Sequence, residues 1–248
     1  MNSGKMPRTV RIGSRGFLFC FPDLGGTNTL VIEGTSFRFF LDTFLGPDPI
    51  REIESYMVQA LGVKTAVAFN SHADWDHIWG NSVFCDRIII AHVDCRRRAM
   101  VEGPGDLVRY AEHMHGRVEL VLPSCLFETR LDFPDEQVSF FHTPGHTRDS
   151  SSCFDAADGV LFAGDNVESP VPYVSSPDLE AYIRTLESYL ALGPRVVVPG
   201  HGEPRDLGLV ASNLEYLRAL SRGETRRTND LSTLDRHAAN LRVLDRKS

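Results

Sequence analysis

The chain has 248 residues, of which 42% are hydrophobic and 24% are charged, a composition typical of globular proteins and unlike that of disordered, collagen-like or coiled-coil chains. The formal net charge is −7, and no apolar run approaches the roughly 18 residues that a membrane span needs. We therefore expect no nucleic-acid partner, since such proteins usually carry a basic face, and no membrane partner.

Strands and helices are predicted to alternate along the first half of the chain. Short apolar runs predict strands at residues 29–32, 37–41, 65–69 and 87–91. Asp48 as the N-cap and Pro49 as the first helical residue predict a helix that ends near Leu61. A second helix over about residues 93–114 should be interrupted at Gly103-Pro104-Gly105.

The second half continues the same alternation. Strands are predicted at residues 137–141, 152–154, 160–163 and 196–198, and helices at 178–192, 206–220 and 232–244. This order predicts an α/β protein with helices layered on buried sheet. No internal repeat or Pro/Ser-rich linker divides the sequence, so we expect a single domain over residues 1–248.

Four of the predicted strands end in residues that can bind a metal. The strand at 65–69 is followed by His72, Asp74, Asp76 and His77, and the later strands are followed by His146, Asp165 and His201. A glycine stands directly before each of the last three, which allows a sharp turn out of the strand. Because ligands gather at the carboxyl ends of strands in open α/β sheets, these side chains are expected to converge.

Imidazole and carboxylate groups are ligands for zinc, iron and manganese. The strand-like alternation predicts His72, Asp74 and Asp76 on one side of an extended segment and His77 on the other. A pair of metals needs this division of ligands together with a carboxylate that bridges the two ions. Asp165 is the candidate bridge, with His146 and His201 completing one metal each.

These motifs resemble the metallo-β-lactamase-fold superfamily, whose signature is H-x-H-x-D-H, a histidine in a PGHT-like turn, a GD pair and a late PGH. The matching blocks here are His72-Ala-Asp74-Trp-Asp76-His77, Pro144-Gly145-His146-Thr147, Gly164-Asp165 and Pro199-Gly200-His201. The resemblance covers about residues 20–205 and leaves 206–248 as a C-terminal helical extension. It implies a four-layer αββα sandwich with the metal site along one edge.

The resemblance also implies roles for the individual residues. By position, His72, Asp74 and His146 would hold the first metal, Asp76, His77 and His201 the second, and Asp165 would bridge them. Asp76 is also the candidate catalytic residue, because the corresponding aspartate of the family often orients the nucleophilic water. Two divalent ions are expected as cofactors, with zinc favoured and iron or manganese as alternatives.

Asp74 departs from the family pattern, which usually has a histidine there. A carboxylate is a harder ligand than an imidazole and favours iron or manganese. The flavodiiron oxidoreductases of the same fold carry a glutamate at this position, so a di-iron oxidoreductase with a separate electron donor is the alternative function. A helix-capping or solvated Asp74 beside a one-metal site is the other alternative.

The expected function is a metal-dependent hydrolase in which hydroxide generated on the metals cleaves an ester, thioester, lactone or phosphoester of a small molecule. A binding protein with a degraded site would not keep so complete a ligand set. The segment 168–177 follows the bridging aspartate directly, and its Tyr173 is the candidate substrate-binding residue. Leu214, Leu217 and Leu220 form an apolar stripe that either packs on the core or mediates a homodimer.

Cysteine usage bears on the compartment. The five cysteines are scattered, odd in number and without a C-x-x-C pair, which indicates neither a disulfide framework nor a cysteine zinc site. The N-terminal apolar stretch 17–21 is too short for the core of a signal peptide. We therefore expect a cytoplasmic protein with free thiols.

Overall fold

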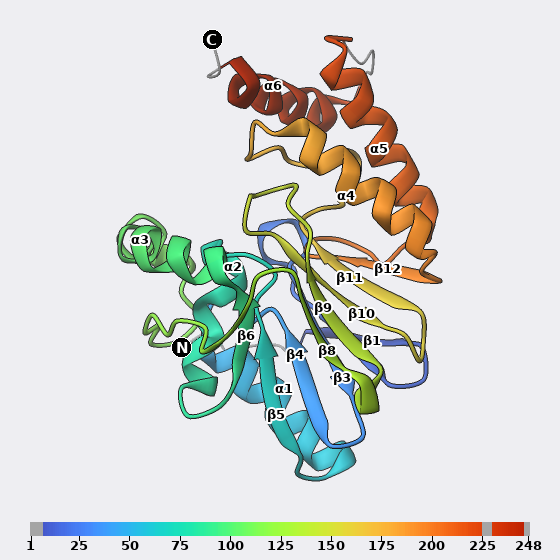
Figure 1. Cartoon of the computed structure of the whole chain (residues 1–248). Helices are drawn as coiled ribbons and strands as arrows, with labels where there is room; N and C mark the ends of the chain where they lie inside the picture. Colours follow the sequence, from blue (N-terminus) through green and yellow to red (C-terminus); the bar gives the residue numbers. More distant parts are fainter. Residues whose placement is uncertain (1–6, 225–229, 246–248) are drawn as a thin grey trace.

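Two β-sheets stack on each other in the computed structural model, which describes residues 7–224 and 230–245 (Figure 1). The first sheet has seven strands in chain order: β1 (Arg8–Ile12), β2 (Gly16–Cys20), β3 (Asn28–Glu33), β4 (Phe37–Leu41), β5 (Thr65–Phe69), β6 (Ile89–His92) and β7 (Cys125–Phe127). Its strands pair antiparallel from β1 to β4 and parallel from β4 to β7.

The second sheet has the order β12-β11-β10-β9-β8. Its strands are β8 (Arg130–Phe133), β9 (Val138–His142), β10 (Ser151–Asp155), β11 (Val160–Gly164) and β12 (Val196–Pro199). β11 and β12 run parallel, and the other neighbours are antiparallel. The parallel pair brings the carboxyl ends of β11 and β12 to the same edge.

Helices cover the two outer faces of the sandwich (Figure 1). The helices are α1 (Pro47–Leu61), α2 (Trp75–Ile78), α3 (Val93–Arg109), α4 (Leu179–Leu192), α5 (Leu207–Ser221) and α6 (Leu231–Asp245). The first core cluster joins α1 and α3 to the outer face of the first sheet, and another joins α4 and α5 to the second sheet. The expected four-layer αββα sandwich is therefore confirmed.

The core between the sheets follows from the period-two alternation of the strands. On β4, Phe39 and Leu41 enter the cluster between the sheets, whereas Phe40 lies in the cluster beneath α1. Phe140 of β9 meets Phe39 across the interface with ring centroids 5.8 Å apart, and it meets Phe69 at 4.7 Å. Aromatic packing thus fixes one sheet on the other and holds the strand ends in register.

Two of the helix predictions are wrong in detail. α1 begins earlier than expected, with Gly46 as the N-cap and Pro47 as the first residue, and Asp48 lies inside the first turn. α3 is not interrupted at Gly103-Pro104-Gly105 but runs to Arg109. Packing overrides the local sequence there, because Gly103 is buried where a Cβ would meet Leu120.

The structure also contains four strands that the sequence patterns did not predict, namely β1, β2, β7 and β8. β7 and β8 have three and four residues, and β1 is mostly exposed at the sheet edge, so these three carry no strong periodic signal. β2 is a buried apolar run that the sequence analysis considered only as a possible signal-peptide core. The predicted stripe of α5 packs on the core, since Leu214, Leu217 and Leu220 are buried with α4. Among the described residues, no helix is both long and apolar enough to cross a membrane.

Candidate metal centre

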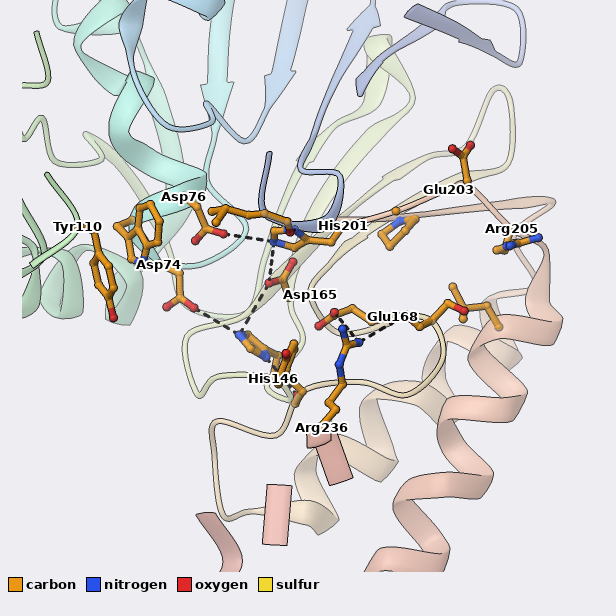
Figure 2. Close-up of a pocket in the computed structure, with 18 residues that line it drawn as sticks. Asp74, Asp76, Tyr110, His146, Asp165, Glu168, His201, Glu203, Arg205 and Arg236 are labelled. Carbon is orange, nitrogen blue, oxygen red and sulfur yellow. Dashed lines mark hydrogen bonds and ion pairs between the residues drawn. The ribbon is translucent and has the colours of Figure 1, made fainter. Parts of the chain in front are cut away.

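Seven predicted side chains converge at one edge of the sandwich. Figure 2 shows five of them, namely Asp74, Asp76, His146, Asp165 and His201. The first sheet supplies four of them from the loop after β5 and from α2, namely His72, Asp74, Asp76 and His77. The second sheet supplies His146 from the turn after β9, Asp165 directly after β11 and His201 after β12. They form two clusters of three potential ligands, with Asp165 between them.

The first triad, as we call His72, Asp74 and His146, is arranged around one carboxylate oxygen. Oδ2 of Asp74 lies 3.3 Å from Nε2 of His72 and 3.4 Å from Nε2 of His146. Nε2 of His72 is buried and has no hydrogen-bond partner among the described residues. A buried, unpaired imidazole nitrogen that faces a carboxylate is the arrangement that a bound cation would satisfy.

The second triad consists of Asp76, His77 and His201. Nε2 of His77 and Nε2 of His201 are 3.2 Å apart, and Oδ2 of Asp76 lies 3.3 Å from that nitrogen of His201. Asp76 therefore lies with His77 and His201, the grouping that the family resemblance implied, although the strand-like alternation placed its side chain on the side of His72 and Asp74. The reason is that α2 begins at Trp75, so helical geometry replaces the alternation at that point.

Asp165 lies between the two triads. Its Oδ2 is 3.4 Å from Nε2 of His77 and 3.5 Å from that of His201, and it is 3.8 Å and 3.9 Å from the corresponding atoms of His72 and His146. Oδ1 of Asp165 is buried without a hydrogen-bond partner in the described part of the chain. One carboxylate therefore faces imidazoles of both triads, as a bridging ligand would.

All four histidines use Nδ1 for a protein contact and turn Nε2 inward. The Nδ1 partners are Ser71 Oγ for His72 at 2.9 Å, Asp42 Oδ2 for His77 at 2.8 Å, the Tyr173 carbonyl for His146 at 3.2 Å and the Leu24 carbonyl for His201 at 3.0 Å. A hydrogen bond at Nδ1 sets the orientation of the ring and presents Nε2 as the ligand atom.

Asp42 is a residue of the candidate site that the sequence analysis missed. It is fully buried and accepts hydrogen bonds from the backbone and the hydroxyl of Ser71, both at 2.7 Å, in addition to its contact with His77. The signal was present, since Asp42 directly follows the predicted strand 37–41, as the other polar residues follow theirs. From the end of β4 it orients both Ser71 and the ring of His77.

Arg98 is the second residue that was missed. Its Nη2 forms an ion pair with Oδ1 of Asp74, its Nη1 lies 2.7 Å from Asp149, and its Nε lies 2.9 Å from Glu102. Asp149 also accepts the backbone N–H of Ala73 at 2.9 Å. Asp74 occupies the N-cap position of α2, but its side chain makes no capping hydrogen bond within the described residues, so capping does not explain it.

The electrostatics give the histidines different protonation states. Burial opposes a charge on His77 and His201, but Asp165 raises the pKa of both imidazoles above the ordinary value, so these two rings would release a proton on binding a metal. Burial, together with the neighbouring His77, lowers the pKa of His72 to about 3, so its imidazole is neutral. Burial opposes the charge on Asp165, but His77 and His201 hold the pKa of that carboxyl well below its ordinary value. Neutral imidazoles and ionised carboxylates are the forms that bind cations.

The three glycines before the ligands act in two different ways. Gly164 has a φ of +55°, a left-handed backbone conformation that fits the sharp turn expected at all three positions. Gly145 and Gly200 instead provide space. A Cβ on Gly145 would lie 2.6 Å from Asn166 and from Tyr182, and one on Gly200 would lie 2.0 Å from Asp165. Close approach of the backbone explains these two positions.

A pocket of about 710 Å³ opens over the two triads (Figure 2). Trp75 and Tyr110 line one end, with ring planes 12° apart and centroids 4.4 Å apart. Glu168, Tyr173 and Arg236 line another part of it. Tyr173, the predicted substrate-binding residue, is thus in place at the pocket wall with 42% of its surface exposed.

Comparison with known families identifies what the chain resembles. The sequence model of the metallo-beta-lactamase superfamily matches residues 22–201, which is most of the chain. A Drosophila melanogaster protein named beta-lactamase-like protein 2 homolog is 27% identical over 206 residues, covering 79% of this chain and 67% of that protein. The Bos taurus acyl-coenzyme A thioesterase MBLAC2 is 24% identical, covering 70% of this chain and 72% of that protein.

Solved structures show the same fold at lower identity. A metallo-beta-lactamase from Pontibacter korlensis has a TM-score of 0.69 at 18% identity, over 85% of this chain and 98% of that one. A metallo-beta-lactamase from Hirschia baltica has a TM-score of 0.68 at 17% identity, over 86% of this chain and 98% of that one. The fold is therefore shared over most of this chain and nearly the whole length of both solved structures.

Proposed function

This chain belongs to the metallo-beta-lactamase superfamily, and from that premise we propose that it is a two-metal hydrolase of small-molecule thioesters. That it is a metallo-hydrolase follows from the family and from relatives named as thioesterases. The number of metals and the thioester are our proposal. The observation that supports two metals is the convergence of two triads on Oδ2 of Asp165.

The proposed ligands follow from this geometry. His72, Asp74 and His146 would hold one ion, Asp76, His77 and His201 the other, and Asp165 would bridge them. Bound divalent cations lower the pKa of a water to about 7 and polarise the carbonyl that is attacked. The chain's own contribution is to fix each Nε2 in place through its Nδ1 hydrogen bond and to keep the carboxylates ionised.

Asp76 is the proposed catalytic residue. Its side chain is 14% exposed and lines the pocket, whereas His77 beside it is fully buried. Burial opposes its charge, but His77 and His201 lower its pKa, so Asp76 is ionised at neutral pH. An ionised carboxylate that reaches the pocket can accept a proton from the attacking water and orient its lone pair.

We propose zinc as the metal, with iron or manganese as alternatives. Four histidines favour zinc, and the carboxylate of Asp74 favours harder ions. Arg98 changes this balance, because its guanidinium takes Oδ1 of Asp74 and leaves Oδ2 for the first triad. The ion pair with Arg98 lowers the negative charge that Asp74 brings to the metal. The net charge of the ligand set is then closer to that of a site in which histidine replaces Asp74.

The thioester is favoured over other esters, lactones and phosphoesters by the names of the two mammalian relatives. The pocket supports this choice, since it has an aromatic end at Trp75 and Tyr110 for an apolar acyl group. Arg205 also lines the pocket, and its positive charge suits an anionic thiol portion. A small anionic molecule, not a nucleic acid, is therefore the proposed substrate.

The runner-up is the di-iron oxidoreductase, which only the carboxylate at Asp74 favours.

We also propose a cytoplasmic location, supported by five cysteines that are all free in the structure. A homodimer stays a proposal, although the leucines that suggested it are buried within this chain.

Metal analysis and an activity assay test the proposal together. The purified protein should contain close to two equivalents of zinc and should release thiol from acyl-coenzyme A, and Asp74→Ala should lose one equivalent. Asp94→Ala, an ion-paired aspartate on the exposed side of α3, is the matched control and should keep both. Two equivalents of redox-active iron without thioester cleavage would favour the oxidoreductase. One equivalent that Asp74→Ala leaves unchanged would refute the two-metal site.

A further inference from the structure

The C-terminal helix α6 contacts the pocket, although it lies outside the residues 22–201 that match the family. Asn240 is fully buried and holds the pocket loop by two backbone bonds. Its Nδ2 donates to the carbonyl of Pro172 at 2.9 Å, and its Oδ1 accepts the N–H of Val174 at 2.9 Å. One side chain of α6 therefore forms hydrogen bonds with the loop on both sides of Tyr173.

Arg236 lies one helical turn before Asn240 and contacts the same loop (Figure 2). Its Nη1 donates to Glu168 Oε2 at 2.9 Å and to the carbonyl of Val171 at 2.7 Å. Its guanidinium also lies over the ring of Tyr173, 4.1 Å from the centroid. This arginine thus supports the aromatic side chain that lines the pocket.

The loop needs such external partners because of its own composition. Pro170, Pro172 and Pro177 have no backbone N–H, so this segment has few donors with which to satisfy its own carbonyls. Buried carbonyls that lack partners cost free energy, and the side chains of α6 supply donors to two of them. The conformation of the loop therefore depends on a helix that is distant in the sequence.

The loop in turn contacts a proposed metal ligand. The carbonyl of Tyr173 lies 3.2 Å from Nδ1 of His146, and the N–H of Ser175 donates to the carbonyl of His146 at 3.1 Å. With Nδ1–H donated to Tyr173, Nε2 of His146 is the nitrogen that faces Asp74. The loop thereby sets both the position of the His146 backbone and the orientation of its ring.

We propose that α6 is a functional part of the active site, in which Asn240 and Arg236 are positioning residues for His146 and for the substrate-facing Tyr173. The inference rests on the proposed role of His146 as a metal ligand. It predicts that metal affinity and substrate affinity respond to changes on α6 at residues that touch neither metal nor substrate.

Zinc titration against a fluorescent chelator, carried out on the full-length chain, tests the effect on the metal. Asn240→Ala should weaken the binding of one of the two zinc ions about tenfold, the lower range for loss of an orienting partner. His146→Ala is the reference variant and should lose that ion altogether. Arg242→Gln changes an exposed arginine on the same helix and should keep both ions at wild-type affinity.

Steady-state kinetics with acyl-coenzyme A test the effect on the substrate. Arg236→Gln should raise KM about tenfold with little change in kcat, because a charge-assisted contact with the loop is worth about that factor. Arg236→Lys keeps the charge but loses the planar fork and should give an intermediate KM. The partly exposed Arg236 provides a second test should Asn240→Ala fail to fold.

The outcomes separate this inference from the proposed function. If Asn240→Ala and Arg236→Gln lower the melting temperature but leave zinc affinity and KM at wild-type values, α6 is a structural helix and the inference is wrong. If His146→Ala keeps both zinc ions, the metal assignment fails instead. In that case the KM of Arg236→Gln still decides whether α6 positions Tyr173.

Discussion

Replacing Gly200 by alanine should damage the metal centre without touching any ligand. A Cβ at this position would lie 2.0 Å from Oδ1 of Asp165 and 3.0 Å from Cε1 of His77, and ordinary contact begins at 3.4 Å. The backbone cannot move aside easily, because the N–H of Gly200 donates to Gly164 and its carbonyl accepts from Asn28, both at 2.8 Å. The carboxylate of Asp165 must therefore give way by more than an ångström.

The size of this displacement sets the expected effect. A misplacement of about 1 Å at a reacting centre costs about 100-fold in rate, so kcat/KM of Gly200→Ala should fall by about that factor. Metal analysis should show fewer than two equivalents, since Asp165 is the proposed bridge. Gly105→Ala, with nothing within 4 Å of the added Cβ, is the matched control and should behave as wild type. Wild-type activity and metal content in Gly200→Ala would refute the reasoning.

Three further predictions concern charge and metal. Arg98→Gln removes the cation that holds the carboxylate of the first triad and should weaken zinc binding there about tenfold in a chelator competition, whereas the exposed Arg97→Gln should not. Burial opposes the charge on Glu33, but Arg38 and Lys64 hold its pKa below the ordinary value of 4.5. The ionised Glu33 therefore stabilises the folded state fully above that pH, and this stabilisation is lost as the pH falls through the lower pKa of the folded state. For Glu33→Gln the free energy of unfolding in urea at pH 7 should be about 3 kcal/mol lower than for wild type, because the buried Arg38 loses its carboxylate partner and keeps only its hydrogen bond to the carbonyl of Gly62. The variant should also lose less stability than wild type on acidification, and equal urea midpoints at pH 7 would contradict this. Chelation should lower the melting temperature and added zinc should restore it, by about 4 kcal/mol of stability at a free zinc concentration 1,000 times Kd, and an unchanged melting temperature would count against a folded-state metal site.

The ligand-bearing strand ends could be predicted because several independent signals coincide there. A buried strand, a glycine and an imidazole or carboxylate follow one another at Gly164-Asp165 and at Gly200-His201, and the structure brings these side chains together. Asp42 carries the same strand-end signal but lacks the glycine and the motif, so it passed unnoticed.

Other parts could not be predicted from local sequence. The pairing of Arg98 with Asp74 depends on how α3 packs beside α2, which is a tertiary contact between residues 24 positions apart in the chain. The same holds for Asn240 and the pocket loop, because nothing in the helical pattern of α6 indicates what its buried asparagine contacts. Short strands such as β7 exist only because a neighbouring strand provides hydrogen bonds.

The division of the ligands between the two sheets has a consequence for how the molecule is assembled. Each triad takes two side chains from the segment after β5 and one from the second sheet, and the bridging carboxylate also comes from the second sheet. Neither half of the chain, cut between β7 and β8, would hold a complete triad. Metal binding would therefore hold the two halves together at one edge. Metal uptake by a mixture of the two fragments would report their reassociation.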